Sequence, residues 1–276
     1  MKKHGSTVFL ILILLIGLSL MLYPSFADWW NSFHQSRAIV NYDQALVNMD
    51  EADYSTFFEQ ADDYNRRIKE IDYPLMHHED VPGYHEALNL TGNGIMGYIQ
   101  IPKINVLLPV YHGTSESVLQ VAVGHLEGTN LPTGGTGNHC VLSAHRGLPS
   151  ARLFTDLDKM EPGDVFMLTI LDRVLTYEVD QILIVEPQDV EPLYPVEGED
   201  LCTLVTCTPY GINTHRLLVR GTRIANIEEK RVIHVTADAI QIDPIIVAPI
   251  VAAFMLLILL IALLLPRSKK RKDNLP

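Results

Sequence analysis

The sequence has few cysteines, few basic residues and no phosphate-binding loop, and each shortage excludes a class of protein. Three cysteines in 276 residues cannot form the disulfide framework of a small secreted domain. The glycine cluster at residues 134–137 lacks the lysine that a nucleotide-binding loop requires. The sequence also shows no internal repeat and no low-complexity segment. It therefore predicts a globular domain whose stability comes from an ordinary hydrophobic core.

Basic residues are scarce outside the two ends of the chain. The chain has 21 lysines and arginines against 33 acidic residues. Seven of the 21 lie at positions 2–3 and 267–272, which leaves 14 basic and 32 acidic residues once Asp273 is set aside. A surface with that charge repels phosphate backbones, so we expect no nucleic-acid partner.

Two apolar segments predict a membrane protein. Val8–Leu22 contains almost nothing polar, and residues 245–265 contain no charged side chain over 21 positions, enough for a helix to cross a bilayer. Basic residues follow the second segment and precede the first, and such residues stay on the cytoplasmic side. We expect a multi-pass protein of the cell membrane with both termini in the cytoplasm and residues 28–240 outside.

The first apolar segment has a second interpretation. At about 15 residues it is short for a span and normal for the apolar core of a signal peptide. Small residues in Ser25-Phe26-Ala27 suit a signal peptidase. We favour an uncleaved anchor over residues 1–27, because no second feature indicates cleavage.

The outer region divides by periodicity. Apolar residues recur every three or four positions between 28 and 71, which predicts helices that pack against a larger body. Prolines and glycines interrupt residues 72–93, which we interpret as a linker or lid without a helix. A barrel domain is expected over 94–230, then a juxtamembrane linker (231–244), the transmembrane helix (245–265) and a basic tail (266–276).

Short strands dominate residues 94–230. Their runs are rich in valine, isoleucine and threonine and are separated by turn residues. Short helices are expected at 116–121 and 153–160. Many short strands with scattered short helices predict a mainly β fold, a closed or nearly closed barrel. The expected strands are 97–101, 106–110, 138–144, 165–170, 174–185, 201–206 and 217–223.

Three polar side chains lie where these strands begin or end. Cys207 and His145 each follow an apolar run, and Arg216 begins the strand after Cys207. A thiol attacks an amide only as the thiolate, so it needs a base to take its proton. His145 could act as that base, and Arg216 could stabilise an oxyanion. The pattern predicts a thiol acyl-transfer site that needs no metal ion and no cofactor.

Other candidate residues fit their sites less well. His77 and His78 follow no metal-ligand spacing. Ser143 lacks the turn of a serine nucleophile, and His215 is expected to point away from Arg216. Cys202 should face away from Cys207 on the same strand; it is either a buried apolar residue or the disulfide partner of Cys140.

The two motifs together resemble the sortase signature. They are Thr203-Leu204-Val205-Thr206-Cys207 with Arg216 downstream, and Ser143-Ala144-His145-Arg146-Gly147 upstream. The run from Cys207 to Leu217, the helices before the barrel and the C-terminal apolar segment are similar to class C, the pilin-polymerising sortases of Gram-positive bacteria. The resemblance implies an eight-stranded sortase barrel.

It also implies a reaction and its partners. Cys207 would cleave an LPxTG-type sorting signal between Thr and Gly, His145 would move the protons, and Arg216 would bind the oxyanion or substrate. Thr206 would contact the substrate. The acyl group would pass to a lysine of another pilin, so pilin subunits and the lipid bilayer are the expected partners.

The sequence differs from class C enzymes in the segment that forms their lid over the active site. Class C enzymes usually carry Asp-Pro-aromatic, whereas this chain has Ile71-Asp72-Tyr73-Pro74-Leu75. We hypothesise that Asp72 meets the arginine and Tyr73 covers the cysteine. A plain linker is the alternative.

Four other functions fit parts of the pattern. An L,D-transpeptidase places its arginine closer to the cysteine, and a papain-like protease places its cysteine at the start of a helix. A wall-anchoring or hydrolytic cysteine transpeptidase of another class remains open. So does a catalytically silent scaffold that binds pilins.

Overall fold

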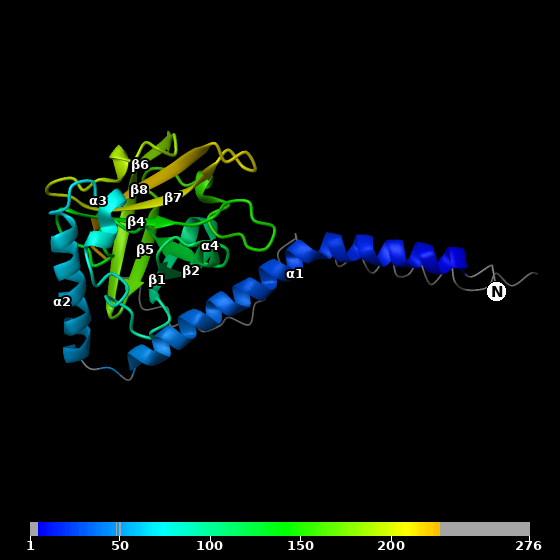
Figure 1. Ribbon diagram of the computed structural model, residues 1–276, viewed down its shortest axis with the longest axis horizontal. Helices are drawn as coiled ribbons and strands as arrows, with labels where there is room; N and C mark the ends of the chain where they lie inside the picture. The colour runs from blue at the N-terminus through cyan, green and yellow to red at the C-terminus, as the bar shows by residue number, and fades with distance from the viewer. Residues whose placement is uncertain (1–4, 48, 50, 227–276) are drawn as a thin grey trace, which may run out of the picture. The chain divides into compact units, whose positions relative to one another are not determined.

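The computed structural model describes residues 5–47, 49 and 51–226 (Figure 1). The predicted linker 231–244, transmembrane helix 245–265 and basic tail 266–276 lie outside the described residues. A compact unit begins at Ala27 and contains the rest of the described chain.

Two helices precede the barrel, as the periodicity predicted. They are α1 (Gly5–Val47) and α2 (Glu51–Ile68). Helix α1 runs without a break through the predicted boundary between residues 27 and 28. Its stretch from Phe9 is long and apolar enough to cross a membrane, by length and composition.

The two helices are fixed to the barrel by buried polar side chains. The Tyr42 hydroxyl of α1 donates to the carbonyl of Met96 at 2.7 Å and accepts from the amide of Leu171 at 2.9 Å. The Asn65 amide group of α2 donates to the Leu131 carbonyl and accepts from the Leu131 amide. Buried side chains in such bonds resist displacement, because opening them leaves polar atoms unpaired.

The barrel consists of eight strands in the closed order β1-β2-β3-β4-β7-β8-β6-β5. This confirms the predicted fold class, with the short strand β3 as an addition. Most neighbours are antiparallel, but β2 pairs with β3 and β4 with β7 in parallel. The strands are β1 (Ile95–Ile101), β2 (Val106–His112), β3 (Val123–His125), β4 (Asn138–Ser143), β5 (Val165–Ile170), β6 (Arg173–Val185), β7 (Asp200–Thr208) and β8 (His215–Ile224).

Short helical turns connect the strands. The helix expected at 116–121 is α4 (Glu116–Leu119), and the one expected at 153–160 shrinks to the 3₁₀ turn η3 (Leu157–Lys159). Another 3₁₀ turn, η2 (Pro102–Ile104), follows β1, and η4 (Glu191–Leu193) lies between β6 and β7.

The segment predicted to lack helix contains two short helical turns. They are α3 (Pro74–His77) and η1 (His78–Asp80). Pro74 stands in the first turn of α3, where its missing N–H has no intrahelical partner to lose. The prediction was wrong because proline breaks a helix in its interior and not at its start.

Both faces of strands β4 and β7 are covered. Leu142 and Leu204 point into the barrel and are fully buried. Their neighbours Val141 and Val205 point outward and pack with Leu193 of η4, in a second small hydrophobic cluster. The loop between β6 and β7 therefore lies over the outer face of the β4–β7 pair, which is where the candidate site lies.

His139 ties that loop to the barrel. Its Nδ1 bonds to the carbonyl of Tyr194 at 3.0 Å and its Nε2 to the Thr203 hydroxyl at 2.7 Å. A neutral imidazole satisfies both bonds, since one nitrogen donates and the other accepts. Burial lowers the pKa of His139 below its ordinary value.

We predict that His139 makes folding sensitive to acid. The unfolded histidine binds a proton below about pH 6.5 while the folded one stays neutral, so stability falls as pH drops through that value. Thermal unfolding from pH 7.5 to 5.5 should show this loss. His139→Gln should reduce it, and the exposed His85→Gln should not. The same pH dependence in His139→Gln and the parent would contradict the assignment.

Candidate active site

Strand register brings two of the predicted residues together. Cys207 near the end of β7 lies directly opposite Arg216 at the start of β8. Residues two apart on a strand share a face, so the side chain of Cys207 is on the same face as that of Val205. Val205 pairs with Leu218 on one side and Ser143 on the other. Ser143 of β4, Val205 of β7 and Leu218 of β8 therefore lie side by side on the outer face of the barrel.

The loop that carries His145 continues this register past the end of β4. The Ala144 amide donates to the Val205 carbonyl at 3.2 Å, and the Thr206 hydroxyl donates to the Ala144 carbonyl at 2.8 Å. His145 lies two residues beyond Ser143, as Cys207 lies two beyond Val205. Cys207 and Arg216 are paired in register, and the same alternation continued past Ser143 would bring His145 onto their face, so the meeting of all three residues stays a prediction.

Thr206 lies beside Cys207 on the inner face of β7, because neighbours on a strand face opposite ways. The residue is 1% exposed, and its hydroxyl donates to the Ala144 carbonyl. Its predicted contact with substrate stays a prediction.

Arg146 holds the histidine loop against the end of β7. Its Nη1 donates to the Thr208 hydroxyl at 3.2 Å and its Nε to the Thr155 carbonyl at 3.2 Å. Its Nη2 pairs with Asp158 at 2.5 Å, and the side chain is 8% exposed. These bonds fix Arg146, which follows His145, to Thr208, which follows Cys207. The sequence showed Arg146 within a motif but gave no signal for this role.

The sequence reasoning also missed Glu116. Its carboxylate lies 3.8 Å from Nε2 of His145, at the start of helix α4. In the sequence Glu116 is only an acid in the first turn of an expected helix, so the barrel had to bring it to His145.

Arg216 lines a pocket of about 370 Å³ on the same face. Its Nη1 donates to the carbonyls of His215 and Asn213. Strands contribute Ser143, Val205 and Leu218 to this pocket, and the β6–β7 loop contributes another wall. A guanidinium next to a thiol at a pocket end can stabilise negative charge on a bound carbonyl oxygen.

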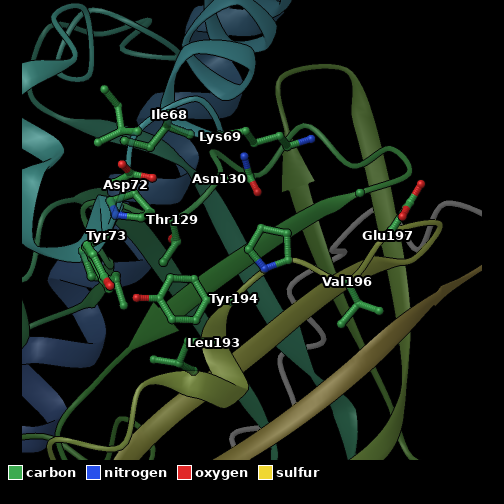
Figure 2. Close-up of a pocket in the computed structure, with 16 residues that line it drawn as sticks. Ile68, Lys69, Asp72, Tyr73, Thr129, Asn130, Leu193, Tyr194, Val196 and Glu197 are labelled. Atoms are coloured by element: carbon green, nitrogen blue, oxygen red, sulfur yellow. The ribbon is translucent and has the colours of Figure 1, made fainter.

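The segment after α2 covers the pocket from outside. Leu75 and His78 line the same pocket as Arg216. Asp72 and Tyr73 line a neighbouring, larger cavity instead (Figure 2). The described contacts include no bond between Asp72 and Arg216, so the predicted pairing of these two residues stays a prediction.

Gly128 permits the close approach of this segment. A Cβ built on Gly128 would lie 2.5 Å from the Pro74 carbonyl oxygen and 2.7 Å from Cα of Leu75. Its φ of +87° is also one that side chains rarely adopt. Any larger residue there would push the segment away from the barrel.

The other two cysteines belong to the core. Cys140 and Cys202 are paired in register on β4 and β7, and both are free thiols. Burial raises the pKa of the Cys202 thiol well above its usual value. The structure thus has buried cysteines instead of the alternative disulfide. Within the described residues no three side chains are grouped as metal ligands.

Comparison with known proteins agrees with this geometry. A family model described as the sortase domain matches residues 99–224. Sortase C1 from Streptococcus agalactiae is 50% identical, with a TM-score of 0.64 over 69% of this chain and 100% of that one. Sortase C from Streptococcus pneumoniae is 46% identical, with a TM-score of 0.61 over 69% of this chain and 97% of that one.

A curated relative matches over a shorter stretch. Sortase A from Streptococcus agalactiae serotype III (strain NEM316) is 33% identical over 117 residues, 41% of this chain. The match spans 47% of that protein, about half its length. This match covers 41% of the chain, whereas each of the two sortase C structures covers 69% of it.

Fold, strand-end residues and comparisons together define a cysteine transpeptidase with a closed eight-stranded barrel. The chain belongs to the sortase family, and its structural neighbours are class C sortases.

We predict that Arg146 positions His145 for catalysis. Arg146→Met keeps an unbranched side chain but removes the bonds to Thr155, Thr208 and Asp158. A displacement of about 1 Å in a catalytic group can cost about 100-fold in rate, so kcat for cleavage of a sorting-signal peptide should fall by about 10- to 100-fold with little change in KM. Arg152→Met, which removes an exposed arginine that pairs with Asp156, is the matched control. Equal kcat in Arg146→Met and the parent enzyme would show that the clamp has no catalytic role.

Proposed function

We propose that this sortase cleaves an LPxTG-type sorting signal between Thr and Gly and transfers the acyl group to a lysine of a pilin. The observation that carries the proposal is the register of β7 and β8, which pairs Cys207 with Arg216 beside a pocket. The bonds of Ala144 to Val205 and Thr206 continue this alignment as far as the residue before His145. The sortase C from Streptococcus pneumoniae is described with pilin substrate specificity, which supports the substrate class.

The first half of the reaction forms a thioester. His145 takes the Cys207 proton, and the sulfur attacks the carbonyl carbon of Thr. Arg216 donates to the oxyanion that develops. The bond from Thr to Gly then breaks, and His145 returns its proton to the leaving amine of Gly.

The second half moves the acyl group to an amine. The neutral amine of a pilin lysine attacks the thioester carbon, and the Cys207 sulfur leaves. His145 removes a proton from the attacking nitrogen, and the product is an isopeptide bond between two pilins. The carboxylate of Glu116 borders the ring of His145, 3.8 Å from its Nε2.

We further propose a membrane location with the barrel outside the cell. The apolar part of α1 supports one anchor by length and composition. The second span at 245–265, the cytoplasmic position of both termini and the multi-pass topology follow from the sequence pattern alone. A sortase held at the membrane meets pilins that are themselves exported.

The segment 72–93 is proposed to act as a lid. Support comes from Leu75 and His78, which line the pocket of Arg216, and from the close fit of the segment over Gly128. Asp72 and Tyr73 directly precede α3, and we keep for them the roles of meeting Arg216 and covering Cys207.

We predict that a peptide substrate becomes bound to Cys207. The full-length enzyme in detergent, incubated with a sorting-signal peptide, should gain the mass of the acyl fragment at Cys207 and release the Gly fragment. Cys207→Ala should gain nothing, and Arg216→Ala should lose about 100-fold in rate, as expected for an oxyanion donor. No thioester and no fragment would leave a silent, pilin-binding scaffold.

With pilin subunits added, a covalent ladder that survives boiling is expected, whereas peptide release without a ladder would favour a hydrolytic or wall-anchoring enzyme.

A separate prediction concerns the lid. Gly128→Ala should displace the lid and increase the rate of thiol labelling at Cys207. A loss of about 1.4 kcal/mol in closure corresponds to tenfold faster labelling. Gly163→Ala is the matched control, because Gly163 has a similar φ of +95° and nothing within 4 Å of its Cβ position. The double variant Asp72→Ala, Tyr73→Ala should also label faster. Unchanged rates in both lid variants would remove the lid from the proposal.

A further inference from the structure

Helix α1 is bonded to the loop that follows His145. Oδ1 of Asp28 accepts from the Arg152 amide at 2.9 Å. Nδ2 of Asn31 donates to the Ser150 carbonyl at 2.9 Å. Asp28 and Asn31 are three residues apart, so they share one face of the helix. The loop is therefore attached to α1 at two points on a single helix face.

The same helix face also holds the segment that carries Glu116. Nε2 of Gln35, four residues after Asn31, donates to the carbonyl of Val121 at 2.7 Å. Val121 follows helix α4, and Glu116 at the start of α4 lies 3.8 Å from Nε2 of His145. Two segments beside His145 are thus fixed to successive turns of α1.

The opposite face of α1 is aromatic and exposed. Trp29, Trp30 and Phe33 are 55%, 52% and 53% exposed. Phe33 lies four and three residues after the two tryptophans, so the three rings form one aromatic stripe along the helix. Trp30 lies two residues after Asp28, which is about 200° around a helix of 3.6 residues per turn. The aromatic stripe therefore points away from the loops that the helix holds.

His34 packs against the aromatic stripe. Its ring centroid lies 4.7 Å from that of Trp30 and 5.8 Å from that of Phe33. Its Nδ1 also bonds to the Trp30 carbonyl at 2.8 Å. Several apolar rings side by side on a surface are typical of a site that another molecule covers.

The position of the aromatic stripe along α1 indicates which molecule that is. Residues 8–27 contain no lysine, arginine, aspartate or glutamate. At 1.5 Å per residue these positions reach about 30 Å, the thickness of the hydrocarbon core of a bilayer. Trp29 and Trp30 follow within one helical turn and Phe33 within two, at the depth of the headgroup layer, which adds about 5 to 7 Å on each side. Tryptophan is enriched in that layer, because its ring is apolar and its N–H can reach water.

We propose that the aromatic stripe binds the phospholipid headgroup layer and that α1 thereby holds the loop after His145 at the outer surface of the membrane. This inference rests on the membrane location proposed above and adds a specific lipid contact to it. Asp28 does not oppose the contact, because its carboxylate faces the loop and accepts the Arg152 amide. The barrel is then held to the lipid by its His145 side and does not swing freely on the end of an anchor.

Intrinsic fluorescence reads the aromatic stripe directly, because Trp29 and Trp30 are the two tryptophans of the chain. The full-length protein is reconstituted into phosphatidylcholine vesicles. Acrylamide in the water should quench its emission several-fold less than that of N-acetyltryptophanamide. Phosphatidylcholine brominated near the glycerol end of its acyl chains should quench the emission more strongly than phosphatidylcholine brominated near the methyl end.

A dye on the loop tests the second half of the proposal. Ser150→Cys is labelled in the Cys207→Ala background, in which the two remaining cysteines are 3% and 0% exposed. Phosphatidylcholine with a nitroxide on its headgroup should quench this label. Asp172→Cys is the matched control, because Asp172 follows Leu171, whose amide bonds to Tyr42 about 20 Å farther along α1. The control label should be quenched several-fold less.

Variants separate the aromatic stripe from the anchor. Trp29→Gln, Trp30→Gln and Phe33→Gln together leave residues 8–27 intact, so the protein should stay in the vesicle and, with its cysteine present, cleave a soluble peptide at the parent rate. Headgroup quenching of the Ser150→Cys label should fall several-fold, since the lipid contact is lost. Val40→Gln removes an apolar side chain that is 51% exposed farther along the helix, and it should retain the quenching.

Each outcome decides a different claim. If acrylamide quenches the tryptophans as strongly as N-acetyltryptophanamide, or if the two dye positions are quenched equally, the lipid contact is overturned and the proposed reaction stands. Protection of the tryptophans that disappears as the protein is diluted in lipid would assign the aromatic stripe to a second copy of the chain and also overturn it. Release of the protein from vesicles by alkaline carbonate would overturn the membrane location, and with it this inference. Absence of peptide cleavage alone would overturn only the proposed reaction.

Discussion

The parallel pairing of β4 with β7 is the constraint on which the site depends. It aligns Ser143 with Val205, and the chain keeps that alignment beyond the strand through the bonds of Ala144. The antiparallel pairing of β7 with β8 adds Arg216 opposite Cys207. A shift of either register by one residue would turn one of these side chains into the core, because strand faces alternate. The buried cysteines strengthen the same pairing from inside, since Cys140 and Cys202 are in register between the same two strands.

Two sets of residues surround Cys207 and Arg216, one beneath them and one above. Arg146 and Thr206 fix the backbone next to the reacting groups from beneath. The segment proposed as a lid and the β6–β7 loop lie over the outer face, where Leu75 and Leu193 line the same two pockets. The fixed layer suits chemistry that needs atoms held closely in place. The proposed lid lies against Gly128 at a distance that only glycine permits.

Much of the fold could be predicted because its signals are local. Alternation of apolar residues marks most strands with errors of one or two residues at their ends, and the helices before the barrel follow from their periodicity. Strand β3 was missed because its three residues, Val123–His125, are too short to show a period. The segment from Pro74 was misjudged because the same proline that ends helices also begins them. The motif gave no sign that Thr206 faces inward, because its burial depends on the strands paired with β7.

The sequence by itself determined the chemistry that is available: one thiol, one imidazole and one guanidinium at strand ends, on an acidic domain between apolar segments. These are properties of single residues and of short runs, and they need no knowledge of distant neighbours. Only the tertiary structure decided that Glu116 lies beside His145, that Leu75 and not Tyr73 lines the pocket of Arg216, and that a larger cavity shares Leu75 and Leu193 with that pocket. Each of these depends on contacts between residues far apart in the chain, which form only when the barrel closes.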